Sequence, residues 1–375
     1  MQFRDLQEQY NNLKTEMDKA VLEVMQTGTF IGGKPVIDLE TQLADYVGVD
    51  HCITCANGTD ALSLVMMAWG ISKGDAVFVP DFTFFASGEI VSLCGATPVF
   101  YDVEMDTFNA DGDSLERAIQ EVLLEGALIP KAIMAVDLFG LPANYRRLEQ
   151  IAQKHNLLLL EDGAQGFGGS IDGIRACSFG DVATTSFFPA KPLGCYGDGG
   201  AIFTNDQGLA EYIRSICVHG KGTYKYDNIR IGVNSRLDTI QAAILQVKLK
   251  AFAEYELNNV NDIAKVYTMG LERMVETPII AEGFGSSWAQ YTIKLKDKIQ
   301  RNDLQQYLNE HGIPSMIYYP KPMHAQTAYK SLQAYVNCEN TNMLCDVVLS
   351  LPMHPYLKKE EVSQIIEFVQ GFLDK

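Results

Sequence analysis

Seven short apolar runs between residues 50 and 205 limit the possible fold more than any other feature of this sequence. They are 52–55, 76–79, 97–101, 132–136, 157–161, 182–185 and 201–204. Stretches with the apolar spacing of helices separate several of them, at 60–69, 84–94, 112–122 and 145–155. Strands that alternate with helices are typical of a mostly parallel sheet covered by helices on both faces, so we predict an α/β fold.

The pattern changes after Asp238. A long helix is predicted over 239–272, followed by a strand within 287–295 and helices near 302–311 and 360–373. We therefore predict a large domain over residues 1–245, which begins with a helical segment, and a smaller C-terminal α+β domain over 246–375. No internal repeat or Pro-rich linker marks the boundary.

The acidic composition argues against several kinds of partner. A net charge of −17 disfavours nucleic acids and anionic membranes, because both are bound by an excess of Lys and Arg. The segment 219–236 is a local exception, either a site for an anionic small molecule or a solvated loop, and its charged residues include Lys221, Lys225, Arg230, Arg236 and Asp227. No apolar run approaches the ~20 residues that span a bilayer, and residues 1–20 lack the apolar core of a signal peptide. We expect a cytoplasmic protein.

The cysteines do not predict a metal site. Cys52 and Cys55 have the spacing of a redox or zinc pair, but no second pair follows at ligand spacing, and both fall in a predicted strand. We expect the eight cysteines to be mostly buried thiols without a disulfide framework, and we expect no metal.

Lys191 and Asp162 are the candidates for a reactive centre. Lys191 lies beside the glycine-rich run 194–200, which we predict to be a tight turn. Asp162 ends the apolar run before it, where an unpaired carboxylate is costly. Pyridoxal phosphate needs these two groups, an amine that holds its aldehyde as a Schiff base and a carboxylate that keeps its ring nitrogen protonated. The alternative for Asp162 is a helix cap or an ion pair with a local Arg.

Other groups suited to this cofactor follow the ends of the predicted strands, where open α/β sheets bind their ligands. Gly58 and Thr59 open a helix and could bind a phosphate, although an ordinary helix N-cap has the same pattern. Ser186 could add a hydroxyl. Phe84 or Phe85 could stack on a flat ring, with the other packed in the core.

Five motifs, taken in their order along the chain, resemble the DegT/DnrJ/EryC1/StrS family of pyridoxal-phosphate-dependent sugar aminotransferases. They cover residues 56–62, 161–165, 185–203, 232–243 and 349–355. The resemblance extends over nearly the whole chain. It implies fold type I, in which a mostly parallel seven-stranded sheet lies between helices and a smaller α+β domain follows.

The resemblance also implies roles for individual residues. Lys191 would be the catalytic lysine that binds the cofactor's aldehyde, and Asn234 would reach the cofactor of a neighbouring subunit, so the active unit would be a homodimer with shared sites. The implied cofactor-binding residues are Gly58, Thr59, Phe84, Asp162, Gln165, Ser186, Lys191 and Asn234. Glutamate would donate the amine, and Lys191 argues against the family's dehydratase branch, which has His at this position.

Within the family, the strings around Cys52–Asp60 and Val233–Asp238 look most like UDP-2-acetamido-2-deoxy-3-oxo-glucuronate aminotransferases, whose products enter surface polysaccharides. The implied substrate-binding residues are Arg236, Tyr318, Tyr319 and His324. Tyr318 stands where that group has His, which keeps 3- or 4-keto-6-deoxy sugars open. Gly163 replaces the usual Ala or Cys, and extra room beside the ring is the expected effect. A cofactor-less sugar-binding or regulatory protein is the alternative of another class.

Overall fold

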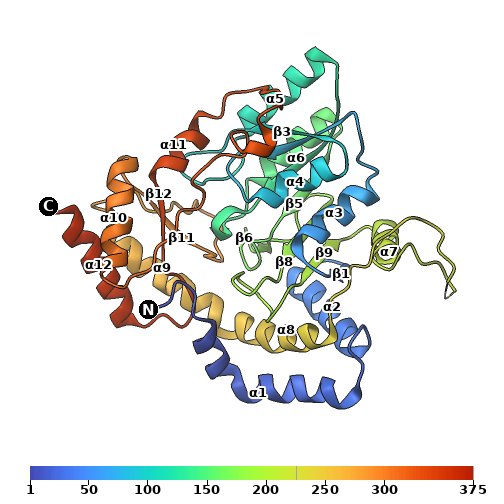
Figure 1. Cartoon of the computed structure of the whole chain (residues 1–375), viewed down its shortest axis with the longest axis horizontal. Helices are drawn as coiled ribbons and strands as arrows, with labels where there is room; N and C mark the ends of the chain where they lie inside the picture. Colours follow the sequence, from blue (N-terminus) through green and yellow to red (C-terminus); the bar gives the residue numbers. More distant parts are fainter. Residues whose placement is uncertain (225, 375) are drawn as a thin grey trace.

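A seven-stranded sheet forms the centre of the chain in the computed structural model, which describes residues 1–224 and 226–374 (Figure 1). The strands lie in the order β1-β9-β8-β5-β4-β2-β3. All run parallel except β9, which is antiparallel to both neighbours. The seven predicted runs are the seven strands: β1 (His51–Cys55), β2 (Asp75–Pro80), β3 (Thr97–Tyr101), β4 (Ile129–Val136), β5 (Leu158–Asp162), β8 (Val182–Ser186) and β9 (Gly200–Thr204). The predicted mostly parallel sheet is confirmed.

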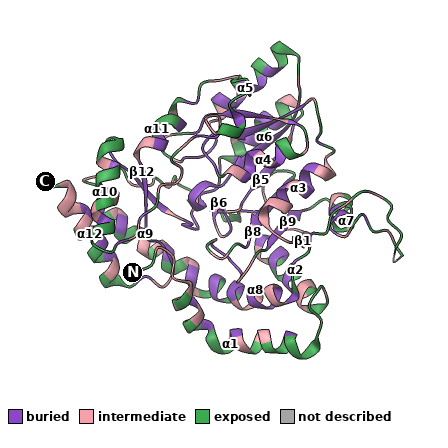
Figure 2. Cartoon of the chain, in the orientation of Figure 1, coloured by how far each residue is buried: buried purple, intermediate pink, exposed green. Residues whose placement is uncertain are grey.

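Apolar side chains on both faces of the sheet explain why its strands read as continuous apolar runs. Val77 and Val79 of β2 belong to the cluster on one face, and Phe78 belongs to the cluster on the other, because successive strand residues point to opposite sides. The first face is covered by α3 (Gly58–Ala68), α4 (Phe85–Leu93) and α7 (Gln207–Ile216), the second by α5 (Gly112–Glu125) and α6 (Tyr145–His155). Figure 2 shows buried strands between helices whose outer sides are exposed.

Two N-terminal helices, α1 (Leu6–Thr27) and α2 (Lys34–Val47), pack against α8 (Thr239–Ala251) beneath the sheet (Figure 1). Leu13, Leu39 and Leu245, one from each helix, lie in one apolar cluster with Phe203 of β9. The expected domain boundary at residue 245 therefore falls inside a helix that packs on the large sheet.

The C-terminal part has its own apolar cluster, whose fully buried members run from Val260 to Val369. The predicted helix over 239–272 is continuous but contains a π-helical turn (Phe252–Glu256) between α8 and α9 (Leu257–Leu271). The predicted strand within 287–295 is only four residues long, β11 (Tyr291–Lys294), and pairs antiparallel with β12 (Val348–Leu351). Around this pair lie α10 (Lys298–Glu310), α11 (Glu339–Val347) and α12 (Lys359–Leu373).

Several short elements had no clear signal in the sequence. A three-stranded sheet joins β10 (Phe284–Gly285), β6 (Ser170–Ile171) and β7 (Ile174–Arg175), and single 3₁₀ turns lie at Leu138–Gly140 and Thr327–Tyr329. Among the described residues, none of the helices combines the length and apolar character needed to cross a bilayer.

Candidate active site

A cavity of about 730 Å³ opens where the carboxyl ends of β1, β2, β5 and β8 meet. Parallel strands bring their carboxyl ends to one edge of the sheet, so residues far apart in sequence converge there. Nine of the twelve predicted site residues line this cavity: Gly58, Thr59, Phe84, Asp162, Gln165, Ser186, Lys191, Tyr318 and Tyr319. Their roles stay predictions, but their convergence is a property of the fold.

Asp162 and Lys191 face the same cavity with opposite charges. Asp162 is buried, and its carboxylate accepts hydrogen bonds from the Ser87 hydroxyl at 2.8 Å and the Ala164 N–H at 3.2 Å. Burial raises the pKa of Asp162, while Ser87, Ala164 and the Lys191 charge oppose this rise. Burial lowers the pKa of Lys191, against the attraction of Asp162. The fold therefore places a carboxylate suited to a cationic partner near an amine with an increased neutral fraction.

The N-terminus of α3 forms another end of the cavity. Asn57 caps this helix, since its side-chain oxygen accepts a hydrogen bond from the Asp60 N–H at 2.8 Å. Gly58 lies so close to Ser186 that a Cβ atom at residue 58 would be 2.7 Å from the Ser186 Cβ. The first turn of a helix favours anions, and the Thr59 and Ser186 hydroxyls lie beside it. This end suits a phosphate group, in addition to the ordinary cap.

Tyr319 and Gln165 contact each other in the cavity. The Gln165 side-chain amide donates to the Tyr319 hydroxyl at 3.1 Å, and its oxygen accepts from the Phe139 N–H at 2.8 Å. Phe84 is 55% exposed and lies 6.4 Å, centre to centre, from the Tyr319 ring. Phe85 packs against the core residue Tyr329, so Phe84 is the freer aromatic face.

The donor set fits pyridoxal phosphate. The cavity holds a reactive amine, a buried carboxylate for a ring nitrogen, an exposed aromatic ring and an anion-binding helix end, in the residues Lys191, Asp162, Phe84 and Gly58. These are the chemical groups that this cofactor requires.

Three predicted site residues lie elsewhere. Asn234 and Arg236 are exposed and do not line the cavity of their own chain. His324 is bound to Asp81, with its ring Nδ1 2.6 Å from one carboxylate oxygen and its N–H donating to the other at 2.8 Å. Together with Cys338 these two residues form a compact group of possible metal ligands. The His–Asp hydrogen bonds explain that grouping without an ion. Lys225 of the basic segment lies outside the described residues.

The cavity also contains residues that sequence reasoning missed. Ser87 follows Thr83 by one helical turn, and the two hydroxyls are 3.0 Å apart. The four-residue spacing of these two hydroxyl residues, next to the predicted aromatic residue Phe84, was the signal in the sequence that could have identified Ser87. Asp198 was also missed and adds a carboxylate to the lining. Lys321, two residues after Tyr319, adds an amine. The extra room expected beside Gly163 is absent, because the Cys177 side chain fills it.

Comparison with known proteins gives consistent results. The model of the DegT/DnrJ/EryC1/StrS aminotransferase family matches residues 11–370. The UDP-2-acetamido-2-deoxy-3-oxo-D-glucuronate aminotransferase of Pseudomonas aeruginosa is 43% identical, over 97% of this chain and 98% of its own. A pleiotropic regulatory protein of Geobacillus stearothermophilus is 39% identical, over 98% and 97%.

Solved structures agree with these sequence matches. A DegT/DnrJ/EryC1/StrS aminotransferase from Brucella abortus superimposes with a TM-score of 0.97 at 48% identity, and the match covers all of both chains. Structures of other similar chains were solved with pyridoxamine phosphate or in a pyridoxal phosphate form.

Proposed function

Because the chain belongs to the DegT/DnrJ/EryC1/StrS aminotransferase family, we propose that it transfers the amino group of glutamate to a nucleotide-linked keto sugar. Its cofactor is pyridoxal phosphate, as in the family. The proposed acceptor is a 3-keto sugar similar to UDP-2-acetamido-2-deoxy-3-oxo-glucuronate, made in the cytoplasm for surface polysaccharide. The observation that best supports this proposal is the convergence of Lys191 and Asp162 in one cavity at the carboxyl ends of the strands.

The residues of the cavity have distinct tasks in this reaction. Bound pyridoxal phosphate supplies an aldehyde that takes up the amino group and a ring that accepts electrons. The carboxylate of Asp162 would hold a proton on the ring nitrogen, and the first turn of α3 with Ser186 would hold the phosphate. Gln165, fixed by Phe139, keeps the Tyr319 hydroxyl in place beside the reacting groups.

Lys191 moves the protons. Its Nζ atom takes the proton from the α-carbon of glutamate, which leaves its amino group behind and departs as 2-oxoglutarate with a keto oxygen from water. In the second half Nζ supplies a proton to the sugar carbon that receives the amino group. An amine acts as a base only when neutral, and burial lowers the pKa of Lys191 in that direction. The negative charge of Asp162 limits this decrease in the pKa of Lys191.

Fewer residues of the cavity bear on the identity of the acceptor sugar than on the cofactor. The relative from Pseudomonas aeruginosa supports a 3-keto uronate, and Lys321 in the cavity lining offers a cation for an anionic group. A 3- or 4-keto-6-deoxy sugar is the second candidate. It is favoured by Tyr318, which brings no cation to the lining.

A homodimer with shared sites is part of the proposal. Asn234 and Arg236 are exposed and lie outside the cavity of their own chain, as expected of residues that complete a neighbour's site. Exposed apolar residues on the same segment, Ile229, Ile231 and Val233, support burial of this region in an interface.

The absorption spectrum of the purified protein tests the proposal. A visible band that glutamate converts to an ultraviolet band would establish the first half of the reaction, after which keto sugars can be screened as acceptors. A protein that stays colourless with added pyridoxal phosphate would favour the regulatory alternative, which the name of the Geobacillus relative keeps relevant. The presence of both Lys191 and Asp162 in the cavity argues against that alternative.

A further inference from the structure

Arg4, two residues before the start of α1, contacts the loop that carries Lys191. The guanidinium of Arg4 donates a hydrogen bond to the backbone carbonyl of Lys191 at 2.7 Å and a longer one to the carbonyl of Pro192 at 3.4 Å. Arg4 is not among the residues that line the cavity. It therefore acts on the backbone of Lys191 from outside the space in which substrates bind.

Arg4 is half-buried and lies beside an unusually polar part of the interior. Lys248 of α8 is 1% exposed and Glu256 is 2% exposed, and both interact electrostatically with Arg4. The carboxylate of Glu256 is held by the Gln9 amide at 2.9 Å and the Tyr356 hydroxyl at 2.6 Å. Arg4 and Lys248 thus place two basic groups near one carboxylate.

The basic groups in this region differ in how fully they are protonated at neutral pH. Burial lowers the pKa of Lys248 to about 7 and that of Arg4 to about 10. Arg4 therefore remains charged at neutral pH, whereas Lys248 is close to its midpoint. A half-buried cation is still costly unless its hydrogen bonds are well made. Two carbonyls of the loop that carries Lys191 supply such bonds to Arg4.

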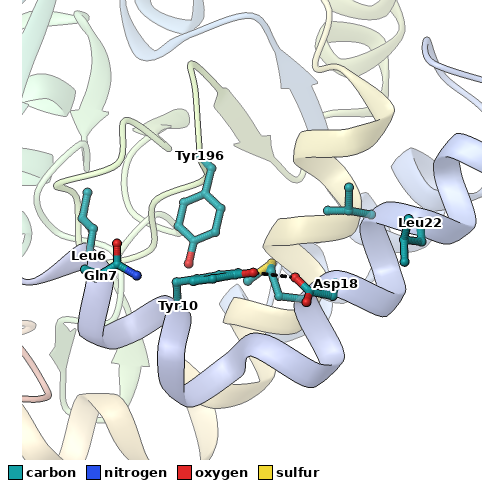
Figure 3. Close-up of a pocket in the computed structure, with 8 residues that line it drawn as sticks. Leu6, Gln7, Tyr10, Asp18, Leu22 and Tyr196 are labelled. Atoms are coloured by element: carbon teal, nitrogen blue, oxygen red, sulfur yellow. Dashed lines mark hydrogen bonds between the residues drawn. The ribbon is translucent and has the colours of Figure 1, made fainter.

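The loop that carries Lys191 depends on contacts of this kind. It includes Gly194 and Gly197, which allow many backbone conformations in the absence of outside contacts. At Tyr196, Gln241 of α8 accepts from the backbone N–H at 2.9 Å and donates to the carbonyl at 3.3 Å. Figure 3 shows the Tyr196 ring directed at Tyr10 of α1, and their ring centres are 6.4 Å apart. Arg4 provides the corresponding contact at the Lys191 end.

We infer that Arg4 is a positioning residue for Lys191, whose backbone it fixes through hydrogen bonds to two carbonyls of the loop. The inference rests on the proposed role of Lys191 as the proton-transferring base. The Arg4 charge lowers the pKa of Lys191, after burial and against Asp162. The other charged or titratable groups around the same cavity are Asp198, Tyr318, Tyr319 and Lys321.

Competitive acetylation of the full-length apoprotein tests this inference without any catalysis. Acetic anhydride labels neutral amines, and peptide mass spectrometry follows Lys191 as a function of pH. Arg4→Met should move the labelling midpoint of Lys191 upward, since a nearby positive charge is lost. Arg4→Lys keeps the charge and should leave the midpoint near that of the wild type.

The glutamate half-reaction gives a second readout. With pyridoxal phosphate bound, Arg4→Met should slow the conversion of the visible band roughly 10-fold or more, because a displaced lysine loses reactive geometry. Arg4→Lys should fall between Arg4→Met and the wild type, because a single ammonium donor replaces the forked guanidinium. Arg4→Gln takes the place of Arg4→Met if the latter does not fold.

Two controls separate positioning from general damage. Arg147→Met removes a surface Arg that pairs with Asp113 and Glu116, and it should change neither readout. Lys248→Met removes a fully buried amine, which faces the Tyr196 ring at 4.7 Å instead of the Lys191 carbonyl. An equal midpoint shift in Lys248→Met, or none in a folded Arg4→Met, would overturn the inference. A wild-type protein that ignores glutamate, but whose Lys191 midpoint still depends on Arg4, would count against the proposed function alone.

Discussion

The Sγ atom of Cys177 lies 2.7 Å from the position that a Cβ atom on Gly163 would occupy. The carbonyl oxygen of Thr184 is 3.1 Å from the same position. Cys177 is fully buried, so the space that an Ala side chain would take after Asp162 is already filled from another part of the chain. The space beside residue 163 is therefore closed by packing and not left open to the cavity.

Gly163→Ala should destabilise the protein by about 1–3 kcal/mol, the usual effect of overpacking. Adding Cys177→Ala should recover part of this loss, since it removes the sulfur atom that the new methyl group meets. Urea denaturation of the two single variants and the double variant measures the coupling. Gly371→Ala, in α12 with open space around it, is the matched control and should be neutral or stabilising. Strict additivity of the two changes would contradict this explanation.

Gly58→Ala should weaken cofactor binding more than it weakens folding. The new methyl group would meet the Ser186 side chain at the proposed phosphate site, where both residues line the cavity. An overpacking cost of this size corresponds to a roughly 10- to 100-fold higher dissociation constant for pyridoxal phosphate. Titration of the apoprotein, followed by the visible band, measures it. Unchanged affinity would remove Gly58 from the phosphate site.

The central sheet was predictable because its signal is local. Each strand is a short apolar run, and strand ends in an α/β sheet share one edge, so Asp162, Ser186 and Gly58 could be grouped before any coordinates. The shape of the C-terminal part was less predictable. Its strand β11 is four residues long, and the π-helical turn between α8 and α9 leaves the helical periodicity nearly intact.

Side-chain partners across long sequence distances were not predictable. Arg4 lies among polar residues before an amphipathic helix and resembles a surface side chain, yet it contacts a carbonyl 187 residues away. His324 fell in a string typical of substrate-binding segments, yet Asp81 binds both its ring and its backbone. Only the tertiary structure decides which of several exposed-looking polar residues turns inward.

Asp137 and Glu161 should make stability fall as the pH rises above about 4. Burial raises the pKa of both carboxyls, and Tyr145 donates to Asp137 at 2.8 Å. Between the ordinary carboxyl pKa and these raised values the folded chain holds more protons than the unfolded chain, so unfolding becomes easier with rising pH. Asp137→Asn should flatten this slope in urea denaturation, while Asp303→Asn on the surface should preserve it.

The His324–Asp81 contact should also make stability fall as the pH rises, but at a higher pH than the buried carboxyls do. The Asp81 hydrogen bond raises the pKa of His324 above 6.5, so its contribution is complete below that value and is lost as the pH rises through the raised one. His324→Gln should therefore reduce stability more at pH 6 than at pH 9. His311→Gln is the control, on a histidine at the end of α10. An equal loss at both pH values would mean that the ring's charge plays no part.

Mixed dimers test whether sites are shared between subunits. Lys191→Ala and Asn234→Ala should each abolish or strongly reduce activity alone. If Asn234 completes the neighbouring cavity, a hybrid of the two variants contains one fully wild-type site and one doubly altered site. Refolding an equal mixture should then restore about a quarter of wild-type activity, since half of the dimers are hybrids with one working site. Lys191→Ala mixed with Asp162→Ala should stay inactive, because those two residues line the same cavity of one chain. Recovery in neither mixture would show that Asn234 serves its own chain.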